Sequence, residues 1–429
     1  MTTNGSASSH ISDVVVIGAG IVGLATARAL LQRYPTLRLT VVDKERAIAQ
    51  HQTGRNSGVL HSGLYYTPGS LKARLCVEGK AALIRYCDER GIPYNLCGKV
   101  VVATETSELP RLEELYRRGE ANGVPGLEMI GPERLREIEP HAFGIKAIYS
   151  PYTGIVDYER VAEAYAQDIR NAGGAIITNC AVQGIARRES MVRIETTANP
   201  IETRFLVACA GVYADRVAAM SGAPRDPRIV PFRGDYYVLK PERQSLIRAL
   251  IYPVPDPSFP FLGVHSTLRM DGSMWLGPNA VLAFAREGYR RWDVNLSDLF
   301  EAVSYRGFQT LAFKFWRTGL DEMIRDFSKK LFVQAAQRFV PELTPDDVVE
   351  GPAGIRAQAL TPDGKLVDDF VINQDGPIVH VRNAPSPAAT SSLAIGQSIA
   401  DTVATAFALD AEYRGERTTN DERRTTTNH

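Results

Sequence analysis

The sequence predicts an α/β protein with a central parallel sheet and a second, α+β region built on a mixed or antiparallel sheet. Residues 13–43 follow the order strand, glycine turn, helix, strand, acid. Apolar runs and helical stretches then alternate as far as Pro224, which is typical of a parallel sheet covered on both faces. After Pro224, short β-type runs separated by proline and glycine favour an antiparallel sheet.

The stretch from Asp13 to Asp43 has the pattern of a Rossmann-like dinucleotide-binding unit. An apolar run, 14–17, meets the turn Gly18-Ala-Gly20-Ile-Val-Gly23, and a helix is expected from about Leu24 to Tyr34. The first glycine permits a tight turn, the second lets a pyrophosphate approach the backbone, and the third packs the helix on the strand. The helix N-terminus offers N–H groups and a partial positive charge to phosphates. Asp43, after a second strand, is placed to accept hydrogen bonds from a ribose diol.

The other elements follow from periodicity, caps and chain breakers. Asp157 is the expected N-cap of a helix that begins at Tyr158. Further helices are expected at about 70–90, 109–120, 132–139 and 391–407, with two or three more between 296 and 339. Further strands are expected at 100–103, 175–179, 181–186, 192–195, 205–211, 230–239, 250–252, 261–267, 274–276, 371–373 and 378–381.

The chain is expected to pass between its two regions more than once. The dinucleotide-binding domain is predicted to comprise residues 12–90, 150–224 and 346–410, and the substrate domain residues 91–149 and 225–345. Residues 1–11 and 411–429 are polar and are expected to be flexible tails.

Composition excludes several classes of protein. Lys plus Arg equals Asp plus Glu, 49 each, which argues against a general nucleic-acid binder. The five cysteines form no CxxC pair and no metal-ligand spacing, so we expect a cytoplasmic protein without a metal. Neither a targeting signal nor an apolar run long enough to span a bilayer is apparent. Gly307–Arg317, GFQTLAFKFWR, is either a membrane-surface or quinone-access patch or an amphipathic helix that covers the second sheet.

A series of short motifs runs through the chain. In order they are GAGIVG, VVDKE, TGRNSGVLHSGLYY, GIVDY, PFRGDYY, YPVPDPSFPFLGVH, GPNAVLAFAREGY, PAGIRAQ, TPDGKLVDDF and NAPSPAATSS. Together they resemble the flavin-dependent L-2-hydroxyglutarate oxidase/dehydrogenase group of the D-amino-acid-oxidase (DAO) superfamily, from about residue 13 to 408. The resemblance implies FAD rather than NAD, a sheet-floored substrate domain and an active site over the flavin ring.

The resemblance and the glycine pattern together give a set of expected cofactor-binding residues. They are Gly18, Gly20, Ile21, Gly23, Asp43, Lys44, Asn56, Ser57, Gly58, Val182, Ala210, Gly211, Gly354, Ala388, Ala389 and Thr390. The loop that ends at Ser391 precedes a helix N-terminus, whose N–H groups would face the pyrimidine end of the flavin, where reduction places negative charge.

Oxidation of a 2-hydroxy acid requires a group that holds the carboxylate and a base that takes the hydroxyl proton. Arginine suits the carboxylate because its planar fork can bond both oxygens. Arg356, in a glycine-containing turn, is the first candidate and Arg233 the second; a structural ion pair is the alternative for each. A five-carbon diacid needs one further donor, for which Tyr66, Arg306 and Lys240 are candidates.

Histidine suits the base because its ordinary pKa, about 6.5, lies near working pH. Of the seven histidines, His61 and His265 are the candidates, one as the base and the other as a substrate-binding group. His61 lies in the loop expected to cover the flavin, and His265 ends the PFLGVH run. A hydrogen-bonded packing role is the alternative for both.

The sequence therefore predicts an FAD-dependent oxidoreductase that converts L-2-hydroxyglutarate to 2-oxoglutarate and passes electrons to a quinone or to oxygen. Peripheral attachment to the inner face of the cell membrane stays open. The alternatives are a related amino-acid or amine oxidase of the same superfamily and a non-catalytic flavin-binding redox sensor.

Overall fold

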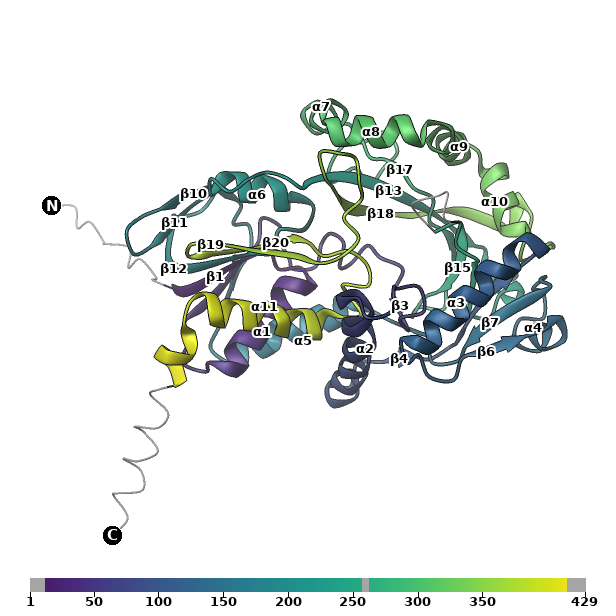
Figure 1. Ribbon diagram of the computed structural model, residues 1–429, viewed down its shortest axis with the longest axis horizontal. Coiled ribbons are helices and arrows are strands. Elements are labelled where there is room, and N and C mark those ends of the chain that lie inside the picture. Colours follow the sequence, from purple (N-terminus) through teal and green to yellow (C-terminus); the bar gives the residue numbers. More distant parts are fainter. Residues whose placement is uncertain (1–11, 257–261, 415–429) are drawn as a thin grey trace, which may run out of the picture.

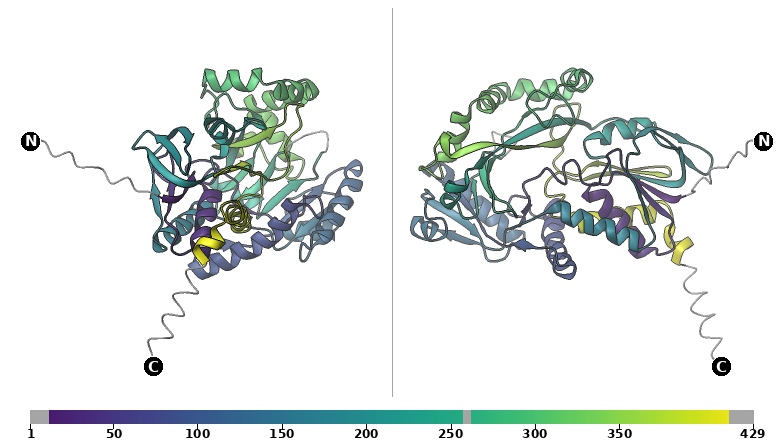
Figure 2. Two further views of the ribbon diagram at one scale, coloured as in Figure 1. Left: turned by 60° about the vertical axis from the view of Figure 1, so that its left-hand side comes forward. Right: turned by 180° about the vertical axis from the view of Figure 1, so that it is seen from behind.

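The structure, a computed structural model, describes residues 12–256 and 262–414. Three predicted segments lie wholly or partly outside the described residues. They are the expected tail 1–11, residues 415–429 of the second expected tail, and Phe261 at the start of the predicted strand 261–267. Two regions lie side by side along the long axis (Figure 1). One contains the glycine-turn segment and the C-terminal helix, and the other contains the middle of the chain, as the view from behind also shows (Figure 2).

The first region is built on an eight-stranded sheet. Its strands are β1 (Ser12–Ile17), β2 (Leu39–Val42), β9 (Ala175–Ile177), β10 (Val182–Arg187), β11 (Val192–Thr196), β12 (Ile201–Ala208), β19 (Val371–Asp375) and β20 (Ile378–Asn383). The strands β9, β2, β1, β12 and β20 are parallel neighbours in that order. β11 pairs antiparallel with the first half of β12, and β19 pairs antiparallel with β20. The predicted parallel core of the sheet is thus confirmed.

Helices cover one face of this sheet. They are α1 (Ile21–Arg33), α5 (Tyr158–Asn171) and α11 (Ser392–Ala406), with α2 (Leu71–Arg90) packed against α11. Helix α1 begins three residues earlier than expected, directly after the N-cap Gly20, and the predicted cap of α5 is confirmed, because Asp157 accepts a hydrogen bond from the amide of Glu159.

The opposite face needs a correction, because helices were expected there as well. It is covered by the short helix α6 (Ala214–Met220) and by the β10–β11 hairpin, whose apolar Ile185, Val192 and Ile194 share a core with Val15 of β1. Alternate residues of a strand point to one face, so this hairpin buries its apolar side without a helix.

The second region contains three smaller sheets. The first is formed by β13 (Arg228–Leu239), β15 (His265–Leu268), β16 (Met274–Gly277), β17 (Val281–Leu282) and β18 (Val348–Leu360). The second is formed by β5 (Lys99–Ala103), β6 (Glu128–Ile130), β7 (Lys146–Ser150) and β14 (Leu250–Pro253), and the third by β3 (Val59–Leu60), β4 (Tyr94–Asn95) and β8 (Gly154–Val156).

The long antiparallel pair β13–β18 corrects one expectation about the site. Arg356 was placed in a glycine-containing turn, but it lies in the middle of β18, opposite Phe232 of β13. The two glycines that precede it do not form a turn: Gly354 pairs with Gly234 of β13, and Gly351 lies within β18 where the register with β13 shifts. The arginine is therefore held by a continuous strand.

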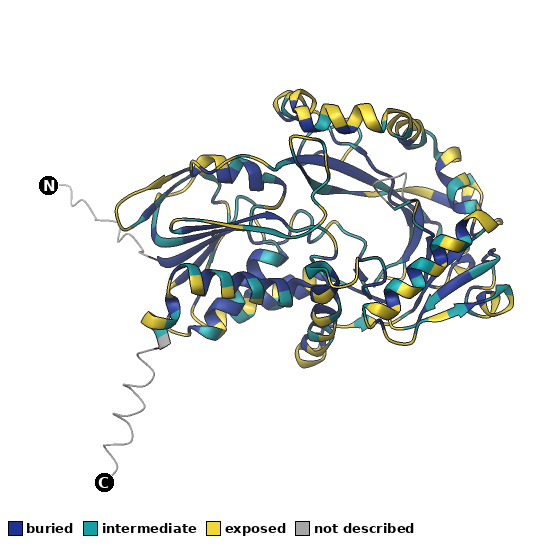
Figure 3. Cartoon of the chain, in the orientation of Figure 1, coloured by how far each residue is buried: buried dark blue, intermediate teal, exposed yellow. Residues whose placement is uncertain are grey.

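Helices surround the second region. They are α3 (Leu109–Ala121), α4 (Pro132–Ile138), α7 (Leu296–Ser304), α8 (Arg306–Lys314), α9 (Trp316–Phe327) and α10 (Lys329–Gln337). Between 296 and 339 there are four helices rather than two or three, because the backbone becomes extended at Tyr305 and Ser328 and leaves helical geometry at Phe315. Many outward-facing positions of α7–α9 are exposed (Figure 3). Of the helices in 12–256 and 262–414, none combines the length and the apolar character needed to span a bilayer.

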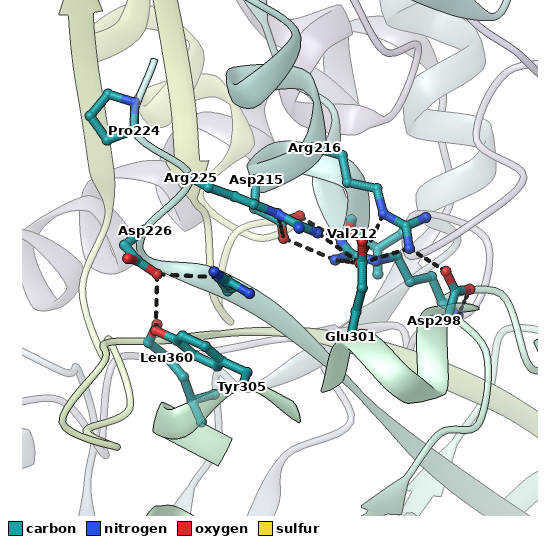
Figure 4. A network of polar contacts seen from close by, with 12 residues as sticks. Val212, Asp215, Arg216, Pro224, Arg225, Asp226, Asp298, Glu301, Tyr305 and Leu360 are labelled. Carbon is teal, nitrogen blue, oxygen red and sulfur yellow. Dashed lines mark hydrogen bonds and ion pairs between the residues drawn. The ribbon is translucent and has the colours of Figure 1, made fainter. Parts of the chain in front are cut away.

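A network of ion pairs connects α6 of the first region to α7 of the second (Figure 4). Fully buried Asp215 accepts two hydrogen bonds from Arg286, at 2.6 and 2.9 Å. Glu301 on α7 accepts from Arg216 at 2.8 Å and from Arg225 at 2.7 Å. Loss of one partner would leave a charge uncompensated in the interior, which is costly. The network therefore helps to fix how the two regions meet.

Candidate functional site

One large cavity, of about 800 Å³, lies where the two regions meet. Its size falls within the range of small-molecule and cofactor sites. Most of the expected site residues line it: Gly18, Gly20, Ile21, Gly23, Asp43, Lys44, Asn56, Ser57, His61, Val182, Ala210, Gly211, His265, Gly354, Arg356, Ala388, Ala389 and Thr390. The fold thus brings residues that are far apart in the chain together around one cavity.

The glycine turn has the geometry that a dinucleotide requires. Gly18 has a φ of +103°, and a Cβ there would lie 2.4 Å from the carbonyl oxygen of Cys209. A Cβ on Gly23 would lie 2.0 Å from the carbonyl oxygen of Gly18, so the third glycine allows the helix to approach the turn. Gly20 is the N-cap of α1 and has no side chain to occupy the first N–H groups of the helix.

Asp43 is anchored at the cavity by the backbone. Its Oδ2 accepts a hydrogen bond from the amide of Ala19 at 2.7 Å, and its Oδ1 accepts from the amide of Glu45 at 2.9 Å. A carboxylate offers about four lone-pair sites, so acceptor capacity for a ribose diol is left. Together with the glycine turn, this carboxylate fits the adenosine and pyrophosphate parts of FAD.

Two loops complete the cofactor end of the cavity. The loop 44–58 lies against β18, where the carbonyl oxygen of Arg55 is 2.5 Å from the position of a Cβ on Gly354. The loop 384–390 leads into α11, whose N-cap Ser391 makes no side-chain capping bond. These residues fit a bound flavin, because the close approach at Gly354 needs glycine and the side chain of Ser391 does not cap the helix N-terminus.

Lys44 lies in a cluster of charged side chains at the edge of the cavity. Its ammonium pairs with Glu287 at 2.5 Å and also with Glu45. His51 bonds Glu45 at 3.0 Å and the hydroxyl of Tyr289 at 2.7 Å. Glu45, His51 and Glu287 have the donor atoms of a metal site, but both carboxylates are paired with the ammonium of Lys44.

His265 and His61 both line the other end of the cavity. Nδ1 of His265 lies 2.8 Å from the carbonyl oxygen of Gly263, and since a carbonyl only accepts, Nδ1 must carry the proton. In the neutral ring Nε2 is then an acceptor. Burial lowers the pKa of each histidine to about 3, with the Lys99 charge a further cause for both, so both rings are neutral at physiological pH.

Arg356 lines the same end, and its Nη1 donates to the carbonyl oxygen of Asn279 at 3.2 Å. Burial lowers its pKa, while Tyr236 and Glu322 raise it. Arginine keeps its charge in proteins, so a guanidinium and two neutral imidazoles line the same cavity. This combination is suited to holding an anion beside a proton acceptor.

Five of the expected or candidate site residues are not among those that line the cavity: Arg233, Tyr66, Gly58, Arg306 and Lys240. Arg233 is buried and paired with Asp235 at 2.8 Å and Asp326 at 2.9 Å. Tyr66 is half-buried, with the ammonium of Lys72 5.2 Å from its ring centroid. Gly58 has a φ of +76° and its amide donates to Asn56 Oδ1, so it shapes the loop.

Several lining residues received no role from the sequence. They are Tyr236, Tyr252, Leu262 and Pro278. Tyr252 and Leu262 belong to the YPVPDPSFPFLGVH motif, which was noticed for its resemblance, and Tyr236 belongs to PFRGDYY. For the two tyrosines, the sequence signal for a place in the site was an aromatic residue within a motif. This signal is weak, because aromatic residues on strands usually pack in a core.

Comparisons with known proteins give the family of the chain. The model of the FAD dependent oxidoreductase (DAO) family matches residues 13–402. L-2-hydroxyglutarate dehydrogenase, mitochondrial, from Nematostella vectensis is 52% identical over 416 residues, covering 92% of this chain and 91% of that protein. The human protein of the same name is 51% identical, with 94% and 91% covered. L-2-hydroxyglutarate dehydrogenase from Indibacter alkaliphilus is 49% identical, with 90% and 98% covered.

The fold is also found among solved structures. The dithionite-reduced L-α-glycerophosphate oxidase from Mycoplasma pneumoniae with FAD bound superposes with a TM-score of 0.76 at 23% identity, covering 92% of this chain and 95% of that one. This likeness confirms the predicted fold class of a parallel cofactor-binding sheet joined to an antiparallel substrate region. The chain belongs to the FAD-dependent oxidoreductase (DAO) family and, within it, to the L-2-hydroxyglutarate dehydrogenase family.

Proposed function

We propose that this protein oxidises L-2-hydroxyglutarate to 2-oxoglutarate. The observation that carries the proposal is that one guanidinium, Arg356, and two neutral imidazoles, His61 and His265, face the same end of a cavity whose other end fits a dinucleotide. The family membership supports the substrate, because relatives about 50% identical, with 91–98% of their length covered, bear its name. FAD, when bound, supplies the acceptor for the hydride.

In the proposed reaction, Arg356 holds the carboxylate next to the hydroxyl group. A guanidinium can bond both carboxylate oxygens, which fixes the orientation of the neighbouring carbon. The base is His265, since its Nδ1–H is donated to Gly263 and Nε2 is left to accept the hydroxyl proton. His61 is then a substrate-binding group. Removal of the proton and of the hydride leaves the 2-oxo acid.

A panel of substrates tests this proposal. Purified holoenzyme is mixed anaerobically with L- and D-2-hydroxyglutarate, a monocarboxylic 2-hydroxy acid and L-glutamate, and the visible flavin band is followed. We expect bleaching by L-2-hydroxyglutarate, with one 2-oxoglutarate formed per flavin. Bleaching by amino acids alone would support a related amino-acid oxidase. A band that no compound bleaches would support the redox sensor.

We also propose that the protein attaches peripherally to a membrane and passes its electrons to a quinone or to oxygen. Helix α8 buries Leu311 in a cluster with Val230 and Phe232 of β13, so α8 covers the β13–β18 sheet. Two aromatic residues are nevertheless exposed nearby: Phe313 of α8 is 84% exposed, and Trp316, the first residue of α9, is 58% exposed. With Trp292, Leu296, Phe300, Leu320, Met323, Ile324 and Phe327 these residues form what we call the apolar ridge.

Exposed apolar patches mark interaction sites, and Arg306, Lys314 and Arg317 lie among the residues of the ridge in the sequence. Aromatic side chains beside cations are suited to a headgroup boundary. Flotation with anionic phospholipid vesicles tests the attachment: Phe313→Ser with Trp316→Ser should lose it, whereas Phe143→Ser, which changes an exposed aromatic residue elsewhere, should not. Equal flotation of all three proteins would contradict the proposal.

A further inference from the structure

Lys99 is a buried lysine at the start of a strand, and the sequence gives this position no functional role. It is the first residue of β5 and is 1% exposed. It pairs with Leu250 as Val101 pairs with Tyr252, so Lys99 shares a sheet face with these apolar neighbours. Within 12–256 and 262–414, no carboxylate forms a salt bridge with it and no acceptor takes a hydrogen bond from its ammonium. Fully buried lysines are rare unless paired, because desolvation of the charge is costly.

Among the described residues, the ammonium contacts two aromatic rings. Its Nζ lies 4.5 Å from the ring centroid of Tyr65 and 4.9 Å from that of Tyr252. These two rings are 6.5 Å apart and nearly parallel. The ring faces attract a cation but do not accept its N–H donors as an anion would. The hydroxyl oxygen of Tyr65 is also buried, and no hydrogen-bond partner for it lies in the part of the chain that the structure describes. Polar groups in this cluster thus remain unsatisfied.

Tyr252 connects this cluster to the candidate active site. Its ring lines the cavity and lies 4.0 Å from the ring of His265, measured between centroids. The charge of Lys99 lowers the pKa of both His265 and His61, so the ammonium lies within electrostatic reach of both imidazoles. Lys99 is therefore next to the wall of the cavity at its histidine end.

The charges around this end are unbalanced. After burial, the groups that lower the pKa of His61 are Lys99, His265, Lys72 and Lys80, all of them basic. Lys72 is paired with Asp368 at 2.9 Å, and buried Lys80 donates to the carbonyl oxygen of Tyr152. Lys99 has neither kind of partner among the described residues. A low-dielectric site with an excess of positive charge favours the entry of an anion.

We propose that Lys99 determines specificity for the second carboxylate of the substrate. Arg356 holds the carboxylate beside the reacting carbon, and the ammonium of Lys99 attracts the carboxylate at the far end of the chain. This inference rests on the proposed function, since a monocarboxylic substrate would have no use for the second charge. The reaction at the hydroxyl-bearing carbon does not require the second carboxylate. Recognition of that carboxylate is therefore a separate task, which needs a cation other than Arg356.

The test compares substrates with and without the second carboxylate. Holoenzymes of the wild type and of Lys99→Met are assayed with L-2-hydroxyglutarate and with L-2-hydroxypentanoate, which has the same chain length. Loss of a charged hydrogen-bond partner should lower kcat/KM for the diacid about 10- to 100-fold and leave that for the monoacid within about threefold. The affinity for glutarate, measured by calorimetry, should fall by a similar factor, whereas that for pentanoate should not change.

A matched control is Lys80→Met, which removes a buried ammonium that already has an acceptor. Its ratio of diacid to monoacid activity should fall by no more than about threefold. Flavin content and near-UV circular dichroism report folding, and Lys99→Gln replaces Lys99→Met should the latter not fold.

Two outcomes overturn the role of Lys99. One is an unchanged substrate ratio in a folded Lys99 variant, and the other is an equal loss on both substrates, which would indicate packing. A wild type inert toward L-2-hydroxyglutarate would instead overturn the proposed function. The glutarate and pentanoate affinities would still test whether Lys99 attracts a second carboxylate.

Discussion

The Nδ1–H of His265 is donated to the carbonyl oxygen of Gly263, 2.8 Å away, and this bond fixes which ring nitrogen is free to accept a proton. His61, by contrast, contacts its surroundings through its backbone, where its amide donates to Thr390 and its carbonyl oxygen accepts from the thiol of Cys76. The two histidines that the sequence could not rank are therefore distinguished by one hydrogen bond.

The first prediction concerns this difference. His265→Asn should lower the rate of anaerobic flavin reduction about 10²- to 10⁴-fold, because the base that takes the hydroxyl proton is lost. His61→Asn should raise KM more than it lowers that rate. Stopped-flow absorbance with saturating L-2-hydroxyglutarate measures both. The reverse order of effects would make His61 the base.

The second prediction separates the two arginines. Arg356→Lys should lower kcat/KM about 10- to 100-fold, because an ammonium cannot reproduce the two parallel bonds of a guanidinium. Arg233→Lys is the matched control: it keeps a cation beside Asp235 and Asp326, so KM should stay within about threefold while the melting temperature falls. A large rise in KM for the Arg233 variant alone would mean that Arg233 binds the substrate and Arg356 has the structural role.

The third prediction concerns the glycine turn. A Cβ on Gly20 would meet only Thr53 Oγ1, at 3.5 Å, which is ordinary contact. Gly20→Ala should therefore fold normally without cofactor but lose at least about tenfold in FAD affinity, because the methyl group blocks the pyrophosphate. Titration of apoprotein with FAD and thermal unfolding measure the two quantities. In Gly23→Ala the fold itself should suffer, since that Cβ would lie 2.0 Å from the Gly18 carbonyl oxygen. Unchanged FAD affinity in Gly20→Ala would contradict this account of the turn.

The fourth prediction follows from the cost of burying Lys99. Burial lowers the pKa of this ammonium from 10.5 to about 7, and nearby Cys76 and Lys80 act in opposite directions. Between these two pKa values the unfolded chain binds more protons than the folded protein, so stability rises with pH. Replacement of a buried charge by an apolar side chain often stabilises by about 1–4 kcal/mol.

Substrate-free Lys99→Met should therefore be more stable than the wild type near neutral pH, and the difference should shrink as the pH rises toward 10.5, the unperturbed pKa of the lysine. Urea unfolding at both ends of this range measures it, with Lys146→Met, an exposed lysine paired with Glu113, as the control. A variant that is less stable than the wild type at both pH values would mean that the ammonium stabilises the fold.

Much of the fold could be predicted because its signals are local. The glycine turn and the cap at Asp157 depend on residues a few positions apart, and the structure has both where the sequence indicates. The GIRAQ segment was assigned to a turn because its glycine is a local turn signal. The pairing of the thirteen-residue strand β18 with β13 makes it part of a strand instead.

The sequence by itself determined the dinucleotide-binding unit and the kinds of residue that the chemistry needs. Only the tertiary structure decided which of those residues meet. Phe232 opposes Arg356 and Arg233 opposes Ile355, so the two arginines lie on opposite faces of the same pair of strands, and one lines the cavity while the other is paired with Asp326. Lys99 looks like an ordinary strand residue until β5 pairs with β14 and brings it beside Tyr252. Backbone conformation is set by neighbours in the chain, but burial and charge balance are set by contacts between distant segments.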